Sequence, residues 1–198
     1  MKLILASGSP YRKALLERLH LPFECHAPEV DETPLAEEPP VKLAMRLAAI
    51  KAAALEQHYP EAVIIGSDQV ACLDRELLGK PGDHQRAFEQ LRKSSGRCVE
   101  FHTGLSVMAP GDRNYGTCET FRVHFRKLSD AEIDRYLQLE QPFDCAGSFK
   151  CEGLGISLFK RLEGDDPTSL EGLPLIALCK ILRKLGLDPH AREDSCQN

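Results

Sequence analysis

The opening stretch of the chain constrains the fold most. Leu3–Ala6 is an apolar run typical of a buried strand, and Ser7–Ser9 is a short polar turn. Pro10 follows, and the pattern predicts a helix that begins there with Ser9 as its cap. The sequence therefore predicts a strand, a tight turn and a helix in immediate succession.

Such a turn is suited to bind an anion, because backbone N–H groups and the positive end of the helix dipole point outward from a helix N-terminus. Arg12 and Lys13 lie in the first turn of this helix. A basic side chain there is unfavourable by roughly 0.3–1 kcal/mol unless an anion offsets it. The pattern indicates an anion site, although a solvated basic pair beside an ordinary cap explains the same residues equally well.

Composition favours one soluble domain with a small ligand. The chain has 198 residues, of which 42% are hydrophobic and 28% charged, and we expect a domain over 1–188 with a polar tail over 189–198. The net charge is −5 and no Lys/Arg block occurs, so a small phosphorylated ligand is favoured over a nucleic acid. No apolar run approaches the roughly 18 residues of a membrane span, and no leader pattern is present, so we expect no membrane partner and a cytoplasmic location.

The eight cysteines do not predict a metal site. They are scattered along the chain without a C-x-x-C pair or a histidine at metal-ligand spacing. We therefore interpret most of them as reduced thiols that act as small core residues.

Helical and alternating patterns predict a mixed α/β protein. An apolar strand over 62–65 runs into Ser67-Asp68-Gln69, which places an acid at the end of a strand. Alternation predicts an antiparallel pair over 98–108 and 121–125. A strand is also expected over 21–25, 156–159 and, as a hairpin, 73–78. A helix is expected at 40–54, with Leu43, Leu47, Ile50 and Ala54 on its apolar face. Further helices are expected at 83–94, 129–139 and 174–185.

Three common phosphate or nucleophile motifs are missing. Gly79-Lys80 is followed by Pro81 and lacks the upstream glycine of a P-loop, while Gly153-Leu154-Gly155 does not open a helix. No G-x-S-x-G elbow supports a serine hydrolase. What remains is a series of short polar motifs at the ends of predicted elements, each of which also has an ordinary structural explanation.

Taken together and in order, these motifs resemble the Maf family of nucleotide pyrophosphatases. The matching segments are Leu5-Ala6-Ser7-Gly8-Ser9-Pro10-Tyr11-Arg12, Glu29-Val30-Asp31-Glu32, Lys51-Ala52, Ser67-Asp68-Gln69-Val70, Gly79-Lys80-Pro81, Ala146-Gly147-Ser148-Phe149 and Gly172-Leu173-Pro174. The resemblance implies a single elongated α/β domain with a mixed, curved sheet flanked by helices and a central nucleotide-binding cleft. It also implies cleavage of a nucleoside triphosphate between the α and β phosphates with a divalent cation (Mg, Mn or Co).

The resemblance also implies roles for individual residues. Ser7, Ser9, Arg12, Lys51 and Lys80 would bind phosphate, Glu29 and Asp68 would hold the metal or its water, and Asp68 would accept the proton. A net-acidic protein can hold a triphosphate, with roughly four negative charges, only with a metal and a few well-placed cations. A homodimer is expected from the resemblance alone.

Tyr11, Gln69 and Glu152 resemble the branch of the family that includes 7-methyl-GTP pyrophosphatase rather than the branch that hydrolyses dTTP and UTP. Methylation at N7 gives guanine a positive charge, which favours stacking on an aromatic ring and pairing with a carboxylate. Tyr11 stands where this branch often has Trp, and Gly8 where a larger small polar residue is common. Two alternatives stay open: a dTTP/UTP or broad-specificity pyrophosphatase, and a nucleotide-binding regulator of cell division without relevant catalysis.

Overall fold

One mixed sheet organises the computed structural model, which describes residues 1–191. The strand order is β2-β1-β3-β5-β6-β7, with β4 also paired to β3. Strand β1 is parallel to β2 and β3, and the other pairs are antiparallel. The strands are β1 (Lys2–Leu5), β2 (Glu24–Cys25), β3 (Ala62–Leu73), β4 (Glu76–Leu78), β5 (Cys98–Ala109), β6 (Arg113–Phe125) and β7 (Phe159–Glu163). The predicted α/β class with a mixed sheet is confirmed.

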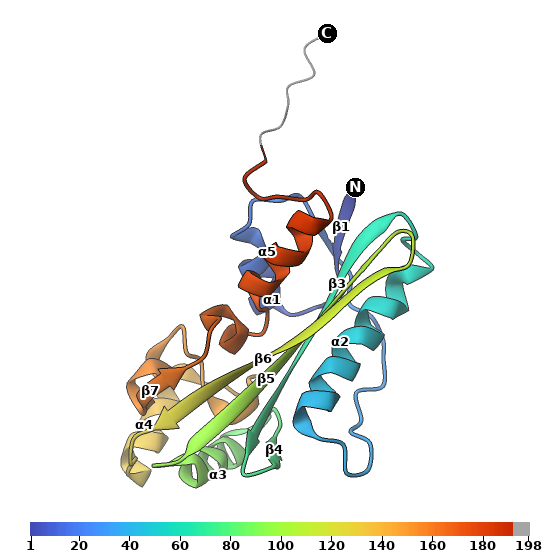
Figure 1. The fold of residues 1–198 in the computed structure, drawn as a ribbon. Coiled ribbons are helices and arrows are strands. Elements are labelled where there is room, and N and C mark those ends of the chain that lie inside the picture. Colours follow the sequence, from blue (N-terminus) through green and yellow to red (C-terminus); the bar gives the residue numbers. More distant parts are fainter. Residues whose placement is uncertain (192–198) are drawn as a thin grey trace.

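The helices cover this sheet along its length and at both ends. Figure 1 shows β3, β5 and β6 as long ribbons that run through the elongated molecule, with α1 and α5 near one end and α3 and α4 near the other. The helices are α1 (Pro10–Glu17), α2 (Pro40–Glu56), α3 (His84–Ser94), α4 (Asp130–Glu140) and α5 (Leu175–Lys184), and the 3₁₀ turns are η1 (Ala146–Ser148), η2 (Leu154–Leu158) and η3 (Pro167–Glu171).

Two large apolar clusters divide the molecule into lobes. One lobe is built around Leu5, Leu16 and Leu178, and so joins β1, α1 and α5. The other is built around Phe101 and Phe149 and includes side chains of α3 and α4. Because β3 and β5 contribute to both clusters, they form the rigid connection between the lobes.

The middle of β3 has one free edge. Strand β1 pairs with β3 over Ala62–Ile65, and β4 pairs with it over Ala71–Leu73. Strand β5 occupies the opposite edge, so within residues 1–191 no strand pairs with Gly66–Val70 on the edge between β1 and β4. The fold thus leaves a gap in the sheet at the segment that contains Asp68.

Helix α2 packs unusually close to the middle of the sheet. A Cβ atom on Gly66 would lie 2.2 Å from the Ala48 carbonyl oxygen, and one on Gly104 would lie 2.3 Å from that of Ala44. The buried face of the helix accordingly carries alanines between its leucines. This close approach brings Lys51, on the same helix, to the free edge of β3.

Several predicted elements are confirmed at their ends. Ser9 caps α1 through its contact with the Arg12 backbone N–H, and Asp83 caps α3. Ser129 and Glu132 form the predicted capping box of α4. The caps were predictable because they depend on neighbours within three residues.

Three expectations are wrong. Strand β3 continues to Leu73, so Asp68 lies within a strand and not at its end. Residues 154–158 form the 3₁₀ turn η2, and the strand begins only at Phe159. Ala54 is exposed, because the buried face of α2 follows Ala44, Ala48 and Ala52 instead.

The carboxyl end is described only in part. Residues 189–191 of the predicted polar tail follow α5, and 192–198 lie outside the described residues. Among residues 1–191, none of the helices has the length and apolar character that crossing a membrane would require.

Candidate active site

A cavity of about 720 Å³ lies at the free edge of β3. Its size is within the range of roughly 300–1,000 Å³ that is typical of small-molecule sites. Its walls come from the turn after β1, the loop before α2, helix α2, the middle of β3, the segment after β4 and the loop over 144–152. The gap in the sheet therefore becomes a cleft that both lobes line.

The turn after β1, where the sequence predicts an anion site, forms one wall. Ser7 is buried, and its Oγ accepts the Ser9 backbone N–H at 3.1 Å. The Ser9 Oγ in turn accepts the Arg12 backbone N–H at 3.4 Å. Both hydroxyl groups therefore act as acceptors within the turn, which leaves their O–H groups available to donate to an anion.

Arg12 is anchored by the distant segment before α5. Its Nε donates to the Gly172 carbonyl oxygen at 2.8 Å, and the buried Ser67 Oγ donates to the same oxygen at 3.0 Å. Gly172 has a φ of 103°, which a residue with a side chain rarely adopts. The late Gly172-Leu173-Pro174 motif thus holds Arg12 against β3, with the terminal guanidinium nitrogens as remaining donors.

Burial lowers the pKa of the Arg12 guanidinium, whereas the nearby carboxylates of Asp68 and Glu32 raise it. An arginine keeps its charge even under such desolvation, because its ordinary pKa is far above neutrality. A desolvated cation with free donors favours an anion as its partner.

Lys51 and Asp68 form the central ion pair. The Lys51 Nζ lies 2.5 Å from Asp68 Oδ1 and 2.7 Å from Glu32 Oε1. Asp68 and Lys51 are each 8% exposed, while Glu32 is on the exposed loop before α2. One ammonium group therefore bridges two carboxylates that approach the cavity from different elements.

Glu29, the other acid expected to hold a metal, is exposed and does not line the cavity. Glu32, three residues further along the same acidic run, lines it instead. Sequence reasoning missed Glu32 as a site residue because the loop over 26–39 has no periodic pattern that would orient one acid rather than the other.

Lys80 and the loop over 144–152 form the opposite wall. Lys80 is exposed and follows β4, and Glu152 is exposed on the glycine-containing loop; both line the cavity. Tyr11 reaches this loop from α1, where its hydroxyl donates to Asp144 Oδ2 at 3.3 Å. Burial, together with Cys145 and Asp144, raises the pKa of the Tyr11 hydroxyl, so this aromatic ring stays neutral.

Gln69 also lines the cavity, but its amide nitrogen is held by protein atoms. It donates to the carbonyl oxygens of Ser169 and Leu170 at 2.8 and 3.0 Å. The buried Thr103 hydroxyl donates to the same Ser169 carbonyl at 2.7 Å. Gln69 therefore fixes η3 against β3. Sequence patterns could not predict this role, because the hydrogen bonds join residues about 100 positions apart.

The site brings together every predicted phosphate-binding residue and the predicted proton acceptor. Ser7, Ser9, Arg12, Lys51, Asp68 and Lys80 all line the one cavity. Tyr11, Gln69 and Glu152 line it as well, whereas Glu29 does not. The fold and the site define a class of α/β proteins with a cleft, lined by serine, arginine and lysine side chains, at a gap in a mixed sheet.

A family model identifies the particular group within that class. The chain belongs to the Maf-like protein family, whose model matches residues 2–185. A HAM1 protein from Coxiella burnetii has a similar fold, with a TM-score of 0.55 and 14% sequence identity over 93% of this chain and 99% of that chain. A nucleoside-triphosphatase, dITP/XTP pyrophosphatase, from Mycobacterium abscessus aligns with a TM-score of 0.48 and 17% identity over 94% and 96% of the two chains.

Proposed function

We propose that this protein is a nucleoside triphosphate pyrophosphatase that hydrolyses the α–β phosphoanhydride of 7-methyl-GTP to 7-methyl-GMP and pyrophosphate. The observation that carries this proposal is the shared cavity of an anion-binding turn, the cation Arg12 and the Lys51–Asp68 pair. The resemblance of the motifs to the Maf family supports the same reaction, and the family match covers all of them.

The phosphate chain would bind at the turn after β1. The hydroxyl groups of Ser7 and Ser9 and the backbone N–H groups at the start of α1 would donate to phosphate oxygens. Arg12 would add charged hydrogen bonds from its terminal nitrogens, and Lys80 would approach from the opposite wall. These groups neutralise and orient the triphosphate.

The residues present fit a divalent cation of the magnesium class. Besides the Oδ1 and Oε1 atoms that contact Lys51, Asp68 and Glu32 each carry a second carboxylate oxygen, and such cations prefer oxygen ligands. Asp68 and Glu32 would hold the cation, with Glu29 as the sequence-based alternative. When bound, the cation would supply charge neutralisation of the phosphates and a more acidic water.

Asp68 would accept the proton of the attacking water. The water oxygen forms a new bond to phosphorus as the anhydride P–O bond breaks, and pyrophosphate leaves with the electron pair of that bond. Lys51 holds Asp68 in place through Oδ1 and would compensate the growing negative charge of the phosphates.

The base would lie between Tyr11 and Glu152. A positively charged 7-methylguanine gains from stacking on the neutral ring of Tyr11 and from donating its N1/N2 edge to the Glu152 carboxylate. Both residues line the cavity beside the loop over 144–152, which Tyr11 contacts through Asp144, so a planar base bound there would meet both side chains.

The test is pyrophosphate release from 7-methyl-GTP, GTP, dTTP, UTP and CTP, each with magnesium, manganese or cobalt. We expect the fastest pyrophosphate release with 7-methyl-GTP. Activity led by dTTP or UTP would keep the reaction and overturn the roles of Tyr11 and Glu152. No activity with any of the metals would overturn the catalytic proposal and favour a nucleotide-binding regulator.

A further inference from the structure

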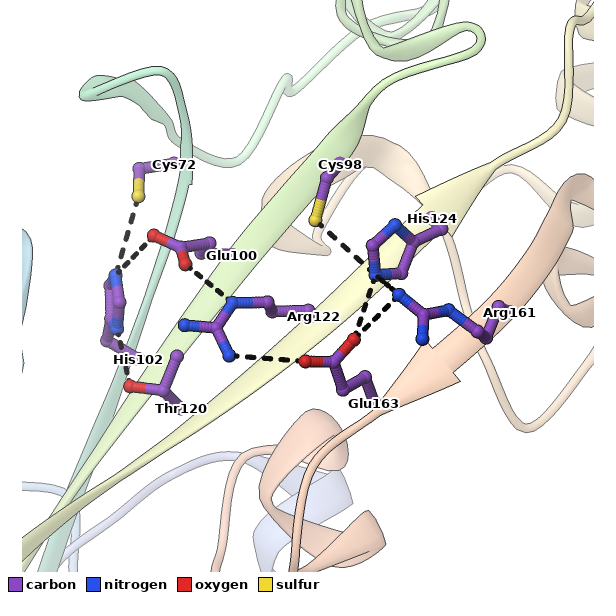
Figure 2. A network of polar contacts seen from close by, with 9 residues as sticks. All are labelled: Cys72, Cys98, Glu100, His102, Thr120, Arg122, His124, Arg161 and Glu163. Carbon is purple, nitrogen blue, oxygen red and sulfur yellow. Dashed lines mark hydrogen bonds and ion pairs between the residues drawn. The ribbon is translucent and has the colours of Figure 1, made fainter.

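A second cluster of metal-ligating side chains lies on the sheet outside the cavity. The Cys72 Sγ, one Glu100 oxygen and the His102 Nε2 all lie within 4.8 Å of one another. Cys72 comes from β3, and Glu100 and His102 come from β5; Figure 2 shows the three side chains pointing toward one point between the strands. None of the three lines the active-site cavity.

Strand pairing explains why these residues meet. Cys72 is directly opposite Glu100 in the antiparallel register, and His102 is opposite Val70, one diagonal step away. Ala71 and Phe101, which line the cavity, alternate with Cys72 and His102 along the same strands. Because successive side chains point to opposite faces of a sheet, the cluster lies on the face away from Ala71 and Phe101.

Two of the three donor separations are close to those of a tetrahedral zinc site, and the third is within 4.8 Å. The Cys72 Sγ lies 3.5 Å from His102 Nε2, and the nearer Glu100 oxygen lies 3.8 Å from the same nitrogen. Usual Zn–S, Zn–N and Zn–O bonds at tetrahedral angles give roughly 3.6 Å between S and N and roughly 3.4 Å between N and O. Small movements of the half-exposed Glu100 side chain therefore suffice to complete the geometry.

Two neighbouring side chains, Thr120 and Arg122, orient the proposed ligands without binding the metal themselves. The His102 Nδ1 is 3.0 Å from the Thr120 hydroxyl. If Nδ1 carries the proton and donates it to Thr120 in a hydrogen bond, Nε2 is unprotonated and its lone pair faces Cys72. Arg122 Nε donates to the other Glu100 oxygen at 2.9 Å. Metal-binding histidines and carboxylates in proteins characteristically have such outer partners.

We propose that Cys72, Glu100 and His102 form a zinc site, with water in the fourth position, that fastens β3 to β5 on the face of β3 that also carries Asp68 and Val70. Sulfur and nitrogen donors select zinc over the hard cations that carboxylates and phosphates prefer, so this site takes a different metal from the one proposed for the cavity. Cys72 also pairs with Leu77 of β4, so the site supports the hairpin that precedes Lys80.

A neighbouring cysteine and histidine provide a natural comparison within the same face. Cys98 and His124 lie 3.9 Å apart, but the His124 Nε2 faces the Arg161 guanidinium at 3.0 Å and Glu163 at 3.4 Å (Figure 2). A guanidinium donates to that nitrogen and occupies its lone pair. Cys98 is therefore the matched control for Cys72.

Zinc must displace a proton from Cys72. Burial, with Glu100 nearby, raises the pKa of its thiol to about 11, so the metal-free side chain is protonated at neutral pH. Because metal binding needs the thiolate, it releases this proton. The balanced step is one Zn²⁺ and one thiol giving a zinc thiolate and one H⁺.

The test is titration of the full chain, stripped of metal with a chelator, with Co²⁺ as a spectroscopic substitute for Zn²⁺. We expect a thiolate-to-cobalt charge-transfer band at a single Co²⁺ per chain, which excess Zn²⁺ removes. Cys72→Ser should abolish the band, and Cys98→Ser and the active-site variant Asp68→Asn should keep it. Thr120→Val should weaken zinc affinity about 10–100-fold.

Two further measurements make the outcome decisive. Zinc should raise the melting temperature of the unmodified chain and of Cys98→Ser, but not that of Cys72→Ser, because a metal that binds only the folded state stabilises it. If Cys72→Ser does not fold, by circular dichroism, His102→Gln takes its place. Absence of the band in the unmodified chain, or its equal loss in Cys98→Ser, would overturn the proposal whether or not the chain hydrolyses nucleotides.

Discussion

The cavity has two regions that differ in how firmly their side chains are held. In the proposed catalytic region, formed by Ser7, Arg12, Lys51 and Asp68, three of the side chains are buried and Arg12 is partly buried, and all four contact backbone groups or one another. In the glycine-loop region, formed by Tyr11, Asp144 and Glu152, Glu152 is exposed, and the Tyr11 hydroxyl contacts the loop through long hydrogen bonds with Asp144 and Cys145.

This difference matches the two tasks that we propose for the site. A proton acceptor must be held in place before the substrate arrives, because misplacement of reacting groups raises the barrier. A base-recognition region tolerates looser side chains, since its contacts form only with the ligand. We therefore expect changes in the catalytic region to affect turnover, and changes in the glycine-loop region to affect the choice of substrate.

The largest expected effect is that of Asp68→Asn. Loss of the proton acceptor should lower turnover by about 10²–10⁴-fold, while Arg12, Lys51 and the turn after β1 keep nucleotide affinity close to its original value. Steady-state kinetics and equilibrium nucleotide binding measure the two quantities. Asp144→Asn, a carboxylate of the other region, is the control and should retain most of the turnover. A fully active Asp68→Asn chain would remove Asp68 from the reaction.

The next effect is expected at Gly66, where the close packing of α2 fixes Lys51 beside Asp68. A methyl group there would meet the Ala48 carbonyl oxygen at 2.2 Å and the Ala52 nitrogen at 2.8 Å, and both are backbone atoms. Gly66→Ala should therefore reduce the free energy of unfolding by about 1–3 kcal/mol or more, measured by urea denaturation, and should reduce turnover in the fraction that folds. Gly79→Ala adds a methyl group with no atom within 4 Å and serves as the control. Equal stability of both variants would contradict the proposed packing.

Glu152→Gln should change preference rather than turnover. Replacing a carboxylate with an amide weakens a hydrogen bond to a cationic base, so the preference for 7-methyl-GTP over GTP should fall about 5–10-fold. The ratio of kcat/KM values for the two nucleotides measures it. Glu171→Gln is the control, because Glu171 lines the cavity but pairs with Arg18. An unchanged ratio in Glu152→Gln would exclude Glu152 from base selection.

The smallest effect is expected at Tyr11. A cation–π contact at a partly exposed site contributes about 0.5–1 kcal/mol, so Tyr11→Leu should raise KM for 7-methyl-GTP about 2–5-fold and leave dTTP unaffected. Tyr11→Phe keeps the ring and loses the hydroxyl contacts with Asp144 and Cys145, so it should behave like the original chain. A large rise in KM for 7-methyl-GTP in Tyr11→Phe would show that the hydroxyl group, and not the aromatic ring, contributes to nucleotide binding.

Local sequence was sufficient for parts of the fold that depend on near neighbours. The cap at Ser9, the helix start at Pro10 and the capping box at Ser129 were all predictable, because their hydrogen bonds join residues within three positions. The same locality made the anion-binding turn visible from sequence. It is the part of the catalytic region that needs no distant partner.

The features that sequence did not predict arise from long-range pairing. Strand β3 is buried on both faces over almost its whole length, so it has no alternation to mark where it continues past Ile65. The choice of Glu32 over Glu29 depends on Lys51, and the anchoring of Arg12 depends on Gly172. Cys72 and His102 meet only through the register of β3 and β5, which a search for closely spaced ligands cannot find.

Cleavage between the α and β phosphates is tested by identifying the products that the unmodified chain and Asp68→Asn form from 7-methyl-GTP with a divalent cation. We expect 7-methyl-GMP and pyrophosphate in equal amounts from the unmodified chain and almost none from Asp68→Asn. Orthophosphate and 7-methyl-GDP as the products, or equal rates for the two chains, would contradict cleavage between the α and β phosphates with Asp68 as the proton acceptor.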